Sequence, residues 1–285
     1  MNLLKPIPQV RVIPLHEVRF HETSDPIRVE KLKNKLMRSG VLKHPPIATS
    51  HNGCFVVLDG TTRTQALSSL KITHMVVQLV TYEEPEVLLD SWHHVIFDCD
   101  LDQLLVQLDE ISDLERIPCK PDEVQRMLTT RQCAFGLMVS DGQCFAYKST
   151  ALLEEQIKQL NHVVSIYRGM TRVFRTISSN FQELRQQHPD LSAVILFPRF
   201  QPEDVTHCAM NHVKFPMGLT RHMIYGRVLG LNIPIQFLSE DQSLNEKNTW
   251  LENEVMERVR SNMIRCYEEC TLVFEEGLQS TSLRY

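Results

Sequence analysis

The chain has 285 residues, of which 42% are hydrophobic and 23% are charged, a composition that fits a globular protein of one large or two ordinary domains. Its formal net charge of −5 argues against a protein built mainly to hold nucleic acid. No run approaches the roughly 18 apolar residues of a membrane span. Because the opening MNLLKPIPQV also lacks a signal-peptide core, we expect a cytoplasmic protein with no membrane partner.

Eight cysteines are scattered along the chain without a CxxC pair. Cys266 and Cys270 lie one helical turn apart, a spacing that suits either a pair of metal ligands or two buried thiols. No second ligand pair lies nearby in the sequence, which favours buried thiols in a reducing compartment.

The first part of the chain alternates between strand and helix signals. Apolar residues from Val10 to Ile13 predict a strand that stops at Pro14, and Pro26 suits the first turn of a helix over about 27–39. A strand entered at 47 and another over 55–58 flank the hairpin signal at 51–53, and a helix after Gly60 and a strand over 75–81 follow. These short elements predict a compact α+β unit.

The stretch VVLDGTTRTQALSSL, at 56–70, combines a buried strand, a turn and a helix. The strand ends at Asp59-Gly60, and Thr61 or Thr62 can cap a helix that begins near Arg63. A strand that turns through glycine into a helix N-terminus aims free backbone N–H groups at one point, which suits a phosphate. A plain strand–turn–helix with a surface arginine explains the same residues.

The second part of the chain also mixes helix and strand signals. Residues 100–130 carry a helical apolar stripe, and the segments 135–139 and 143–147 flank Asp141-Gly142, the clearest hairpin signal in the chain. Further helices are expected over 150–163, 165–186 and 246–263, with a buried strand over 194–197 and a strand over 270–274 that closes the second sheet.

Glu22 lies in a predicted loop, between a histidine and a helix that starts at proline. Near a phosphate site, a carboxylate can accept the proton of an attacking hydroxyl or position a metal ion. An acidic residue before a helix can equally serve only to favour the helix N-terminus. Arg28, six residues further on, suits either a phosphate or carboxylate contact or an ordinary surface position.

A second polar cluster lies in the segment PMGLTRHMIYGR, at 216–227. In an extended segment Thr220 and His222 share one face, and Arg221 takes the other. Such a cluster can bind the polar ends of a small amino acid or a phosphate, or it can form a strand with an exposed basic face. Upstream, the WHH stretch at 92–94 suits either a domain-junction core or an aromatic wall for a ligand.

Taken in order, these motifs resemble the free L-serine kinases, which share a superfamily with the ParB/sulfiredoxin-type nucleotide-binding domain. The superfamily signature is an apolar strand followed by D-G-x-H-R, and this chain has DGTTR at 59–63. The kinase segment L-H-E-x-x-x-P-x-R is matched by FHETSDPIR at 20–28. The remaining motifs are H-P, W-x-H, and G-x-T-R followed by G-R, matched by His44-Pro45, Trp92-His93-His94, Gly218 to Arg221 and Gly226-Arg227.

The resemblance implies an α+β enzyme with a ParB/sulfiredoxin-like nucleotide-binding domain at 1–98, packed against a C-terminal α+β domain at 99–285 that contributes the substrate pocket. The active site is expected in the cleft. The implied reaction phosphorylates free L-serine to O-phospho-L-serine, with ATP or ADP as the phosphoryl donor and Mg²⁺ as cofactor.

The same resemblance assigns roles to particular residues. Glu22 is the implied general base on the serine hydroxyl, and Asp59 assists near the metal ion and the transferred phosphoryl group. The implied nucleotide-binding residues are His44, Gly60, Thr61, Thr62 and Arg63. The implied serine-binding residues are Arg28, Trp92, His94, Thr220, Arg221, His222 and Arg227.

One position departs from the family pattern, because Thr62 stands where the family has a histidine. Threonine keeps a hydrogen-bond donor for phosphate but lacks the reach of imidazole and any positive charge. The choice of nucleotide and the turnover rate are therefore left open by the sequence.

The alternative function is a ParB-like nucleotide-binding regulator, transcriptional or DNA-associated, without kinase turnover. Proteins of that kind carry a helix-turn-helix and a basic face after the nucleotide domain, whereas residues 100–130 are rich in acids and show no convincing recognition helix. A sulfiredoxin-like reductase is disfavoured because the signature turn has no cysteine. The sequence does not decide the oligomeric state, or whether the product feeds cysteine or diaminopropionate and siderophore synthesis.

Overall fold

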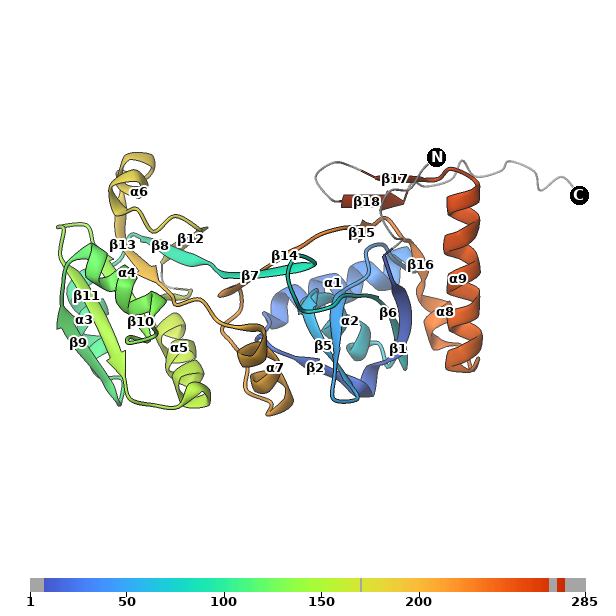
Figure 1. Ribbon diagram of the computed structural model, residues 1–285, viewed down its shortest axis with the longest axis horizontal. Coiled ribbons are helices and arrows are strands. Elements are labelled where there is room, and N and C mark those ends of the chain that lie inside the picture. The colour runs from blue at the N-terminus through green and yellow to red at the C-terminus, as the bar shows by residue number, and fades with distance from the viewer. Residues whose placement is uncertain (1–7, 170, 267–270, 275–285) are drawn as a thin grey trace, which may run out of the picture. The chain divides into compact units, whose positions relative to one another are not determined.

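The computed structural model describes residues 8–169, 171–266 and 271–274. The chain forms two compact units: unit 1 comprises the described parts of 1–20, 24–88 and 224–285, and unit 2 comprises 21–23 and the described parts of 89–223 (Figure 1). The boundaries fall within β7 (Val87–Ser91) and β14 (Thr220–Ile224), which pair with each other. Both units mix helices and strands, so the predicted α+β class is confirmed.

Unit 1 is built on a five-stranded sheet in the order β1-β6-β4-β5-β2. The elements of its N-terminal part are β1 (Val10–Pro14), a 3₁₀ turn (Leu15–Glu17), β2 (Val18–Phe20), α1 (Pro26–Ser39), β3 (Val41–Leu42), β4 (Ile47–His51), β5 (Cys54–Asp59), α2 (Thr61–Ser69) and β6 (His74–Leu79). Its C-terminal part adds β15 (Arg227–Leu229), β16 (Ile233–Pro234), α8 (Ile235–Ser239), α9 (Leu244–Arg260), β17 (Ile264–Cys266) and β18 (Thr271–Phe274).

Local signals set the ends of the elements of unit 1. The Asp25 carboxylate accepts hydrogen bonds from the N–H groups of Ile27 and Arg28 at the start of α1, and Gly40 ends that helix with a φ of 66°. Asn52 and Gly53 both have positive φ, as a two-residue hairpin between β4 and β5 requires. The predicted strands and hairpin of this part are confirmed.

The C-terminal segment completes the core of unit 1. Val57, Val76 and Leu67 pack in one apolar cluster with Leu238 and Leu251, which come from α8 and α9. The sequence places the domain boundary at 98 and assigns everything after it to a second domain, whereas the structure returns the chain to unit 1 at Ile224. The physical reason is burial, since the apolar faces of α8 and α9 lie against this sheet and its helices.

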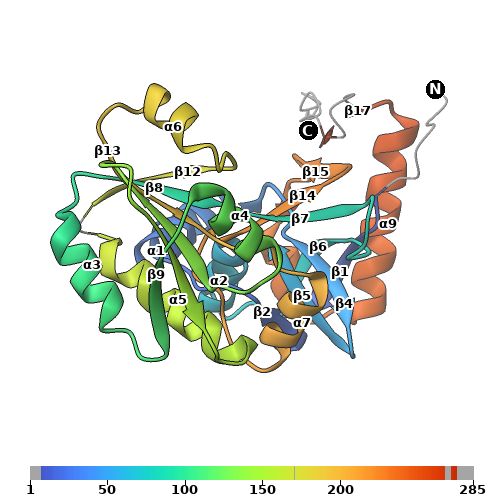
Figure 2. The same cartoon turned by 60° about the vertical axis from the view of Figure 1, so that its left-hand side comes forward.

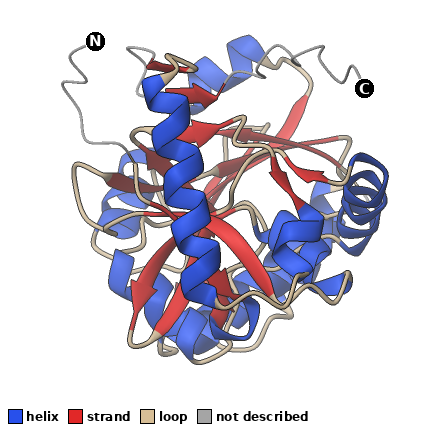
Figure 3. Cartoon of the chain, turned by 90° about the vertical axis from the view of Figure 1, so that its right-hand side faces the viewer, coloured by secondary structure: helices blue, strands red, loops and turns tan. Residues whose placement is uncertain are grey.

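The long helix α9 covers the edge strand β1 of the five-stranded sheet, and it runs across the front of Figure 3. Its Asn248 side chain accepts a hydrogen bond from the N–H of Val12 at 2.8 Å and donates one to the carbonyl of Val12 at 3.1 Å. One amide therefore satisfies both backbone groups of Val12, which would otherwise be exposed on the edge strand.

Unit 2 contains an antiparallel six-stranded sheet in the order β12-β8-β13-β10-β11-β9, which Figure 2 brings forward. Its elements are β8 (His93–Phe97), α3 (Leu101–Asp109), β9 (Leu114–Pro118), α4 (Pro121–Thr129), β10 (Phe135–Val139), β11 (Cys144–Ser149), α5 (Leu153–Tyr167), β12 (Arg172–Thr176), α6 (Phe181–Gln187), β13 (Leu191–Leu196) and α7 (Pro202–Met210). All residues of β10 are buried, which means that both faces of the sheet are covered at its centre.

The core of unit 2 follows the alternation of its strands. On one face, Met138 and Val194 pack with Val124 and Leu128 of α4. On the other face, the rings of Phe135 and Tyr147 stack with centroids 4.3 Å apart. The predicted hairpin around Asp141-Gly142 joins β10 to β11 and is confirmed.

Three sequence expectations differ from the structure. The predicted helix over 165–186 is wrong, because Gly169 takes a φ of 87° after α5 and the chain then enters β12, which pairs with β8. The helical expectation over 100–130 overlooks β9, which pairs with β11. The strand near 270–274 is β18, which pairs with β15 and β17 in unit 1 rather than closing the second sheet. Within the described ranges, no helix is long and apolar enough to cross a bilayer.

Candidate functional site

The entry to α2 requires glycine at position 60. Gly60 has a φ of 97°, and a Cβ there would lie 2.9 Å from the Cβ of Pro46. The helix begins at Thr61 with Gly60 as its N-cap, and no side chain caps it. The expectation that Thr61 or Thr62 caps a helix starting near Arg63 is therefore wrong, because the helix starts two residues earlier.

Thr61 brings an unsatisfied hydroxyl to this helix N-terminus. The residue is 2% exposed, and its Oγ1 has no hydrogen-bond partner among the described residues. A buried hydroxyl without a partner costs about 1–3 kcal/mol. The first N–H groups of a helix likewise lack intrahelical partners. This end of α2 thus holds several donors suited to an anion.

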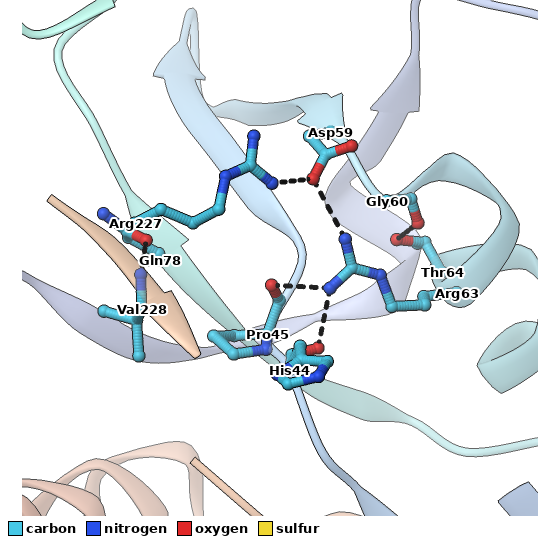
Figure 4. A network of polar contacts seen from close by, with 9 residues as sticks. All are labelled: His44, Pro45, Asp59, Gly60, Arg63, Thr64, Gln78, Arg227 and Val228. Carbon is cyan, nitrogen blue, oxygen red and sulfur yellow. Dashed lines mark hydrogen bonds and ion pairs between the residues drawn. The ribbon is translucent and has the colours of Figure 1, made fainter. Parts of the chain in front are cut away.

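Asp59 joins two arginines beside the same helix end (Figure 4). Its Oδ2 accepts hydrogen bonds from Arg63 Nη2, at 3.0 Å, and from Arg227 Nη1. Arg63 also donates through Nη1 to the carbonyls of His44, at 2.9 Å, and Pro45, at 3.1 Å. Two guanidinium groups and one carboxylate leave a net positive charge, which favours binding of an anion.

The two arginines also fix the ionisation of Asp59. Burial alone would raise the pKa of this carboxyl, but the charges and hydrogen bonds of Arg63 and Arg227 outweigh burial and hold the pKa below its ordinary value. Asp59 is therefore an anion at neutral pH. It holds both guanidinium groups in place without cancelling their combined charge.

Gln78 positions Arg227 through the backbone on either side of it, and Figure 4 shows the contact on the Val228 side. The buried Gln78 amide donates to the carbonyl of Gly226 at 3.1 Å and accepts from the N–H of Val228 at 2.8 Å. Because both neighbours of Arg227 are held by one side chain, the direction in which Arg227 leaves β15 is set.

His44 is neutral and oriented. Burial lowers its pKa, and the charges of Arg63, Lys43 and Lys35 lower it further. Its Nδ1 accepts a hydrogen bond from the N–H of Gly230 at 2.9 Å, which leaves the ring proton on Nε2. The ring lines a cavity of about 520 Å³ that is also lined by Arg63, by Leu32 and Lys35 of α1, and by neighbouring residues, a size that fits a small molecule.

In unit 2, the short segment 21–23 is held against the segment 215–218. Phe215 donates its N–H to the carbonyl of His21 at 2.7 Å and accepts from the N–H of Thr23 at 2.9 Å. Glu22, between them, accepts a hydrogen bond on Oε2 from the N–H of Gly218 at 3.1 Å. The backbone on both sides of Glu22 is thus fixed, and its carboxylate is held by the Gly218 N–H.

His21 connects this segment to β14. The residue is fully buried, and its Nε2 lies 2.9 Å from Thr220 Oγ1. The His222 ring meets the His21 ring edge-on, with centroids 5.1 Å apart. Thr220 and His222 therefore lie on one face of the strand, as the alternation of an extended segment predicts.

Arg221 lies on the other face of β14, against Trp92. Its guanidinium carbon is 4.9 Å from the centroid of a Trp92 ring, and Nη1 is 4.0 Å from Asp90 Oδ2. The backbone N–H of Trp92 donates to the carbonyl of Leu219 at 2.8 Å. These contacts join the WHH stretch to the Thr220–His222 cluster within unit 2.

His94 is a buried, neutral imidazole. Burial lowers its pKa to about 4, while the nearby backbone of Gly218 partly opposes this effect. Its Nδ1 lies 2.6 Å from the Tyr167 hydroxyl, and its Nε2 has no hydrogen-bond partner among the described residues. A buried ring nitrogen in this condition is suited to a polar ligand.

No family model matches the chain. The chain is 25% identical over 272 residues to the ATP-dependent L-serine kinase SbnI of Staphylococcus aureus, and the match covers 94% of this chain and 97% of that protein. The resemblance to the free L-serine kinases is confirmed.

Solved structures of serine kinases share this fold. C-terminally truncated SbnI from Staphylococcus aureus matches with a TM-score of 0.70 at 19% identity, covering 88% of this chain and 97% of that one. A free serine kinase in complex with AMP matches with a TM-score of 0.69 at 17% identity, covering 84% of this chain and 97% of that one.

On this fold, the residues predicted from the sequence fall into two groups. Unit 1 holds His44, Asp59, Gly60, Thr61, Thr62, Arg63 and Arg227, and unit 2 holds Glu22, Trp92, His94, Thr220, Arg221 and His222. Arg227, which the sequence groups with the serine-binding residues, contacts Asp59 instead. The Arg28 side chain is exposed on α1. The backbone N–H of Arg28 donates a hydrogen bond to the Asp25 carboxylate that caps this helix.

Two positioning residues, Gln78 and His21, carry no signal in the motifs by themselves, although His21 adjoins Glu22 and falls within the family segment. No three His, Cys, Asp or Glu side chains of the described ranges gather as a metal site. Cys270 lies outside the described residues, so the expectation that Cys266 and Cys270 are buried thiols rather than metal ligands stays a prediction.

Proposed function

We propose that this chain is a kinase that transfers a phosphoryl group from ATP or ADP to the hydroxyl of free L-serine. The observation that carries the proposal is the Asp59–Arg63–Arg227 cluster at the N-terminus of α2, in a chain similar over 94% of its length to an ATP-dependent L-serine kinase. Phosphoryl transfer depends mainly on positioning and charge stabilisation, which such a cluster supplies.

In unit 1, the nucleotide phosphates bind at the start of α2. The backbone N–H groups after Gly60 and the unsatisfied Thr61 hydroxyl donate hydrogen bonds to phosphate oxygens. Arg63 and Arg227, held by Asp59, supply the positive charge. Thr62, half-buried in the first turn of α2, adds a hydroxyl donor in place of the family imidazole.

Mg²⁺ fits this group of residues in one respect. Both arginines bind Oδ2 of Asp59, whose side chain is 38% exposed, so Oδ1 is the atom suited to a metal ion. Mg²⁺ commonly takes one or two protein carboxylates together with substrate phosphates and water. When bound, it neutralises phosphate charge that develops during transfer.

In unit 2, free L-serine binds among Trp92, His94, Thr220, Arg221 and His222. His21 holds the hydroxyl of Thr220 and the ring of His222, so the polar face of β14 is preorganised. Glu22 is the general base. The serine hydroxyl oxygen bonds to the terminal phosphorus of the nucleotide, the bond to the bridging oxygen breaks, and the hydroxyl proton passes to the Glu22 carboxylate.

Incubation of the protein with L-serine, Mg²⁺ and either ATP or ADP, followed by chromatographic assay of O-phospho-L-serine, tests the proposal. We expect product with at least one nucleotide, accompanied by the nucleotide that has lost one phosphate. Absence of product with both nucleotides contradicts the proposal. The alternative function, a nucleotide-binding regulator without kinase turnover, is then favoured.

A further inference from the structure

Strand β12 of unit 2 carries an arginine that none of the sequence motifs includes. Arg175 lies opposite His94 in the pairing of β12 with β8. Its Nη2 donates to the carbonyl of Met217 at 3.4 Å. The guanidinium also lies directly over Gly218, where any Cβ would collide with it.

Gly218 links this arginine to the proposed general base. The N–H of Gly218 donates to Glu22 Oε2, while the space that a side chain would occupy holds the Arg175 guanidinium. The φ of Gly218 is 73°, a conformation that glycine adopts without strain. A single residue without a side chain thus allows the carboxylate of Glu22 and the cation of Arg175 to approach the same backbone.

Arg175 also influences His94. The pKa of His94 is lowered to about 4, mainly by burial, and the positive charge of Arg175 is a further cause of the lowering. The His94 ring nitrogen Nε2 has no hydrogen-bond partner among the described residues, and Arg175 itself is exposed. The cation, the unsatisfied ring nitrogen and the Glu22 carboxylate therefore surround the Gly218 backbone within one unit.

Free serine differs from a serine side chain in a protein by its charged ammonium and carboxylate groups. A site that selects the free amino acid needs a cation for the carboxylate, and the planar guanidinium binds a carboxylate through two parallel hydrogen bonds. We infer that Arg175 binds the α-carboxylate of the serine substrate and thereby selects the free amino acid. This inference rests on the proposed kinase function.

Other arginines of unit 2 are engaged differently. Arg221 stacks on Trp92 and lies 4.0 Å from Asp90, on the face of β14 opposite to Thr220 and His222. Arg168 follows the end of α5, and its Nη2 lies 3.6 Å from Met217 Sδ. It is the alternative residue for binding the serine carboxylate. Arg175 is favoured over it because a paired strand fixes its backbone beside His94.

Ethanolamine provides the test, because it keeps the hydroxyl and ammonium groups of serine and lacks only the carboxylate. The ratio of kcat/KM for serine to kcat/KM for ethanolamine measures the contribution of the carboxylate. In Arg175→Met we expect this ratio to fall about ten- to a hundred-fold through loss of serine activity, and Arg175→Lys should recover part of it. Nucleotide affinity, carried by unit 1, should stay unchanged and show that the variants are folded.

Arg172→Met is the matched control. Arg172 lies on the same strand, is exposed, and pairs with Asp190 at 2.7 Å. We expect it to keep the wild-type ratio. An unchanged ratio in Arg175→Met, or a larger fall in Arg168→Met, overturns the inference while leaving the kinase function intact. Failure of the wild-type protein to phosphorylate serine overturns both.

Discussion

The Glu22 carboxylate and the Gly218 backbone are joined by a hydrogen bond of 3.1 Å, although 196 positions separate the two residues. Glu22 is held further by its neighbours, since His21 and Thr23 both bond to the backbone of Phe215. A carboxylate fixed in this way can be changed to an amide with little effect on its position, because an amide oxygen also accepts a hydrogen bond.

Glu22→Gln tests the general base. The variant keeps an acceptor for the Gly218 N–H but cannot take up the serine proton. We expect kcat for phosphoserine formation to fall about 10²- to 10⁴-fold, the usual contribution of a general base, while nucleotide affinity stays unchanged. Product formation at saturating substrates and nucleotide titration calorimetry measure the two quantities.

The control for this variant is Glu155→Gln, which removes an exposed acid of the same unit that pairs with Lys158. It should keep wild-type turnover. If Glu22→Gln also keeps wild-type turnover, Glu22 does not act as the base, and another group must accept the proton.

Arg63→Ala tests the phosphate site of unit 1. The change removes a guanidinium that binds Asp59 and two backbone carbonyls. Loss of a charge-assisted contact costs about 1.5–3 kcal/mol, so we expect nucleotide affinity to fall roughly ten- to a hundred-fold. Titration calorimetry with ATP and ADP measures the effect. Arg38→Ala, at an exposed position near the end of α1, serves as the control, and equal affinities in the two variants would refute the assignment.

Gly60→Ala tests the geometry of the turn before α2. An added Cβ must adopt positive φ and would meet Pro46 at 2.9 Å, so we expect the free energy of unfolding to fall by about 1–3 kcal/mol. Urea denaturation measures the loss. Gly53→Ala is the matched control, because Gly53 also has positive φ but has nothing within 4 Å of an added Cβ. The difference between the two variants isolates the contact with Pro46, and equal losses would show that this contact is unimportant.

The buried His94 makes stability depend on pH. Its pKa is about 4 in the folded protein because burial disfavours the charged ring, against 6.5 as the ordinary value. Between these values the unfolded chain binds more protons than the folded one, so stability is lost as pH falls through about 6.5 towards 4. At pH 5, His94 lowers the free energy of unfolding by about 2 kcal/mol relative to its value well above pH 6.5.

Urea denaturation at pH 7 and pH 5 checks this prediction. His94→Asn should show a smaller loss between the two pH values than the wild-type protein. His16→Asn, which changes a ring whose side chain is 80% exposed, should keep the wild-type loss. Equal losses in His94→Asn and the wild-type protein would contradict a neutral, buried His94.

The turn at 59–63 could be predicted from the sequence because its signals are local. A buried strand, a glycine and a helix follow each other within fifteen residues, and the structure confirms that succession. The start of the helix at Thr61 is not predicted, because it depends on the positive φ of Gly60 and on its contact with Pro46, which lies just before β4. The alternation of side chains along an extended segment also predicts correctly that Thr220 and His222 lie on one face of β14.

The parts that sequence reasoning missed depend on long-range contacts. Gln78 fixes Arg227 across about 150 positions, and no local pattern marks a glutamine within a buried strand as a positioning residue. Arg175 lies in a segment predicted to be helical, where the pairing of β12 with β8 decides the structure. Arg227 was grouped with its sequence neighbours, whereas the structure places it against Asp59.

In the proposed reaction, the terminal phosphoryl group of a nucleotide moves to the hydroxyl of free L-serine. ATP labelled with ¹⁸O in its γ-phosphoryl group, or ADP labelled in its β-phosphoryl group, is incubated with L-serine and Mg²⁺, and O-phospho-L-serine is examined by mass spectrometry. We expect a product that carries the labelled phosphoryl oxygens with the wild-type protein and not with Glu22→Gln. If the labelled phosphoryl group is released only as inorganic phosphate, or is not released from either nucleotide, the protein does not transfer it to serine and the proposed function is wrong.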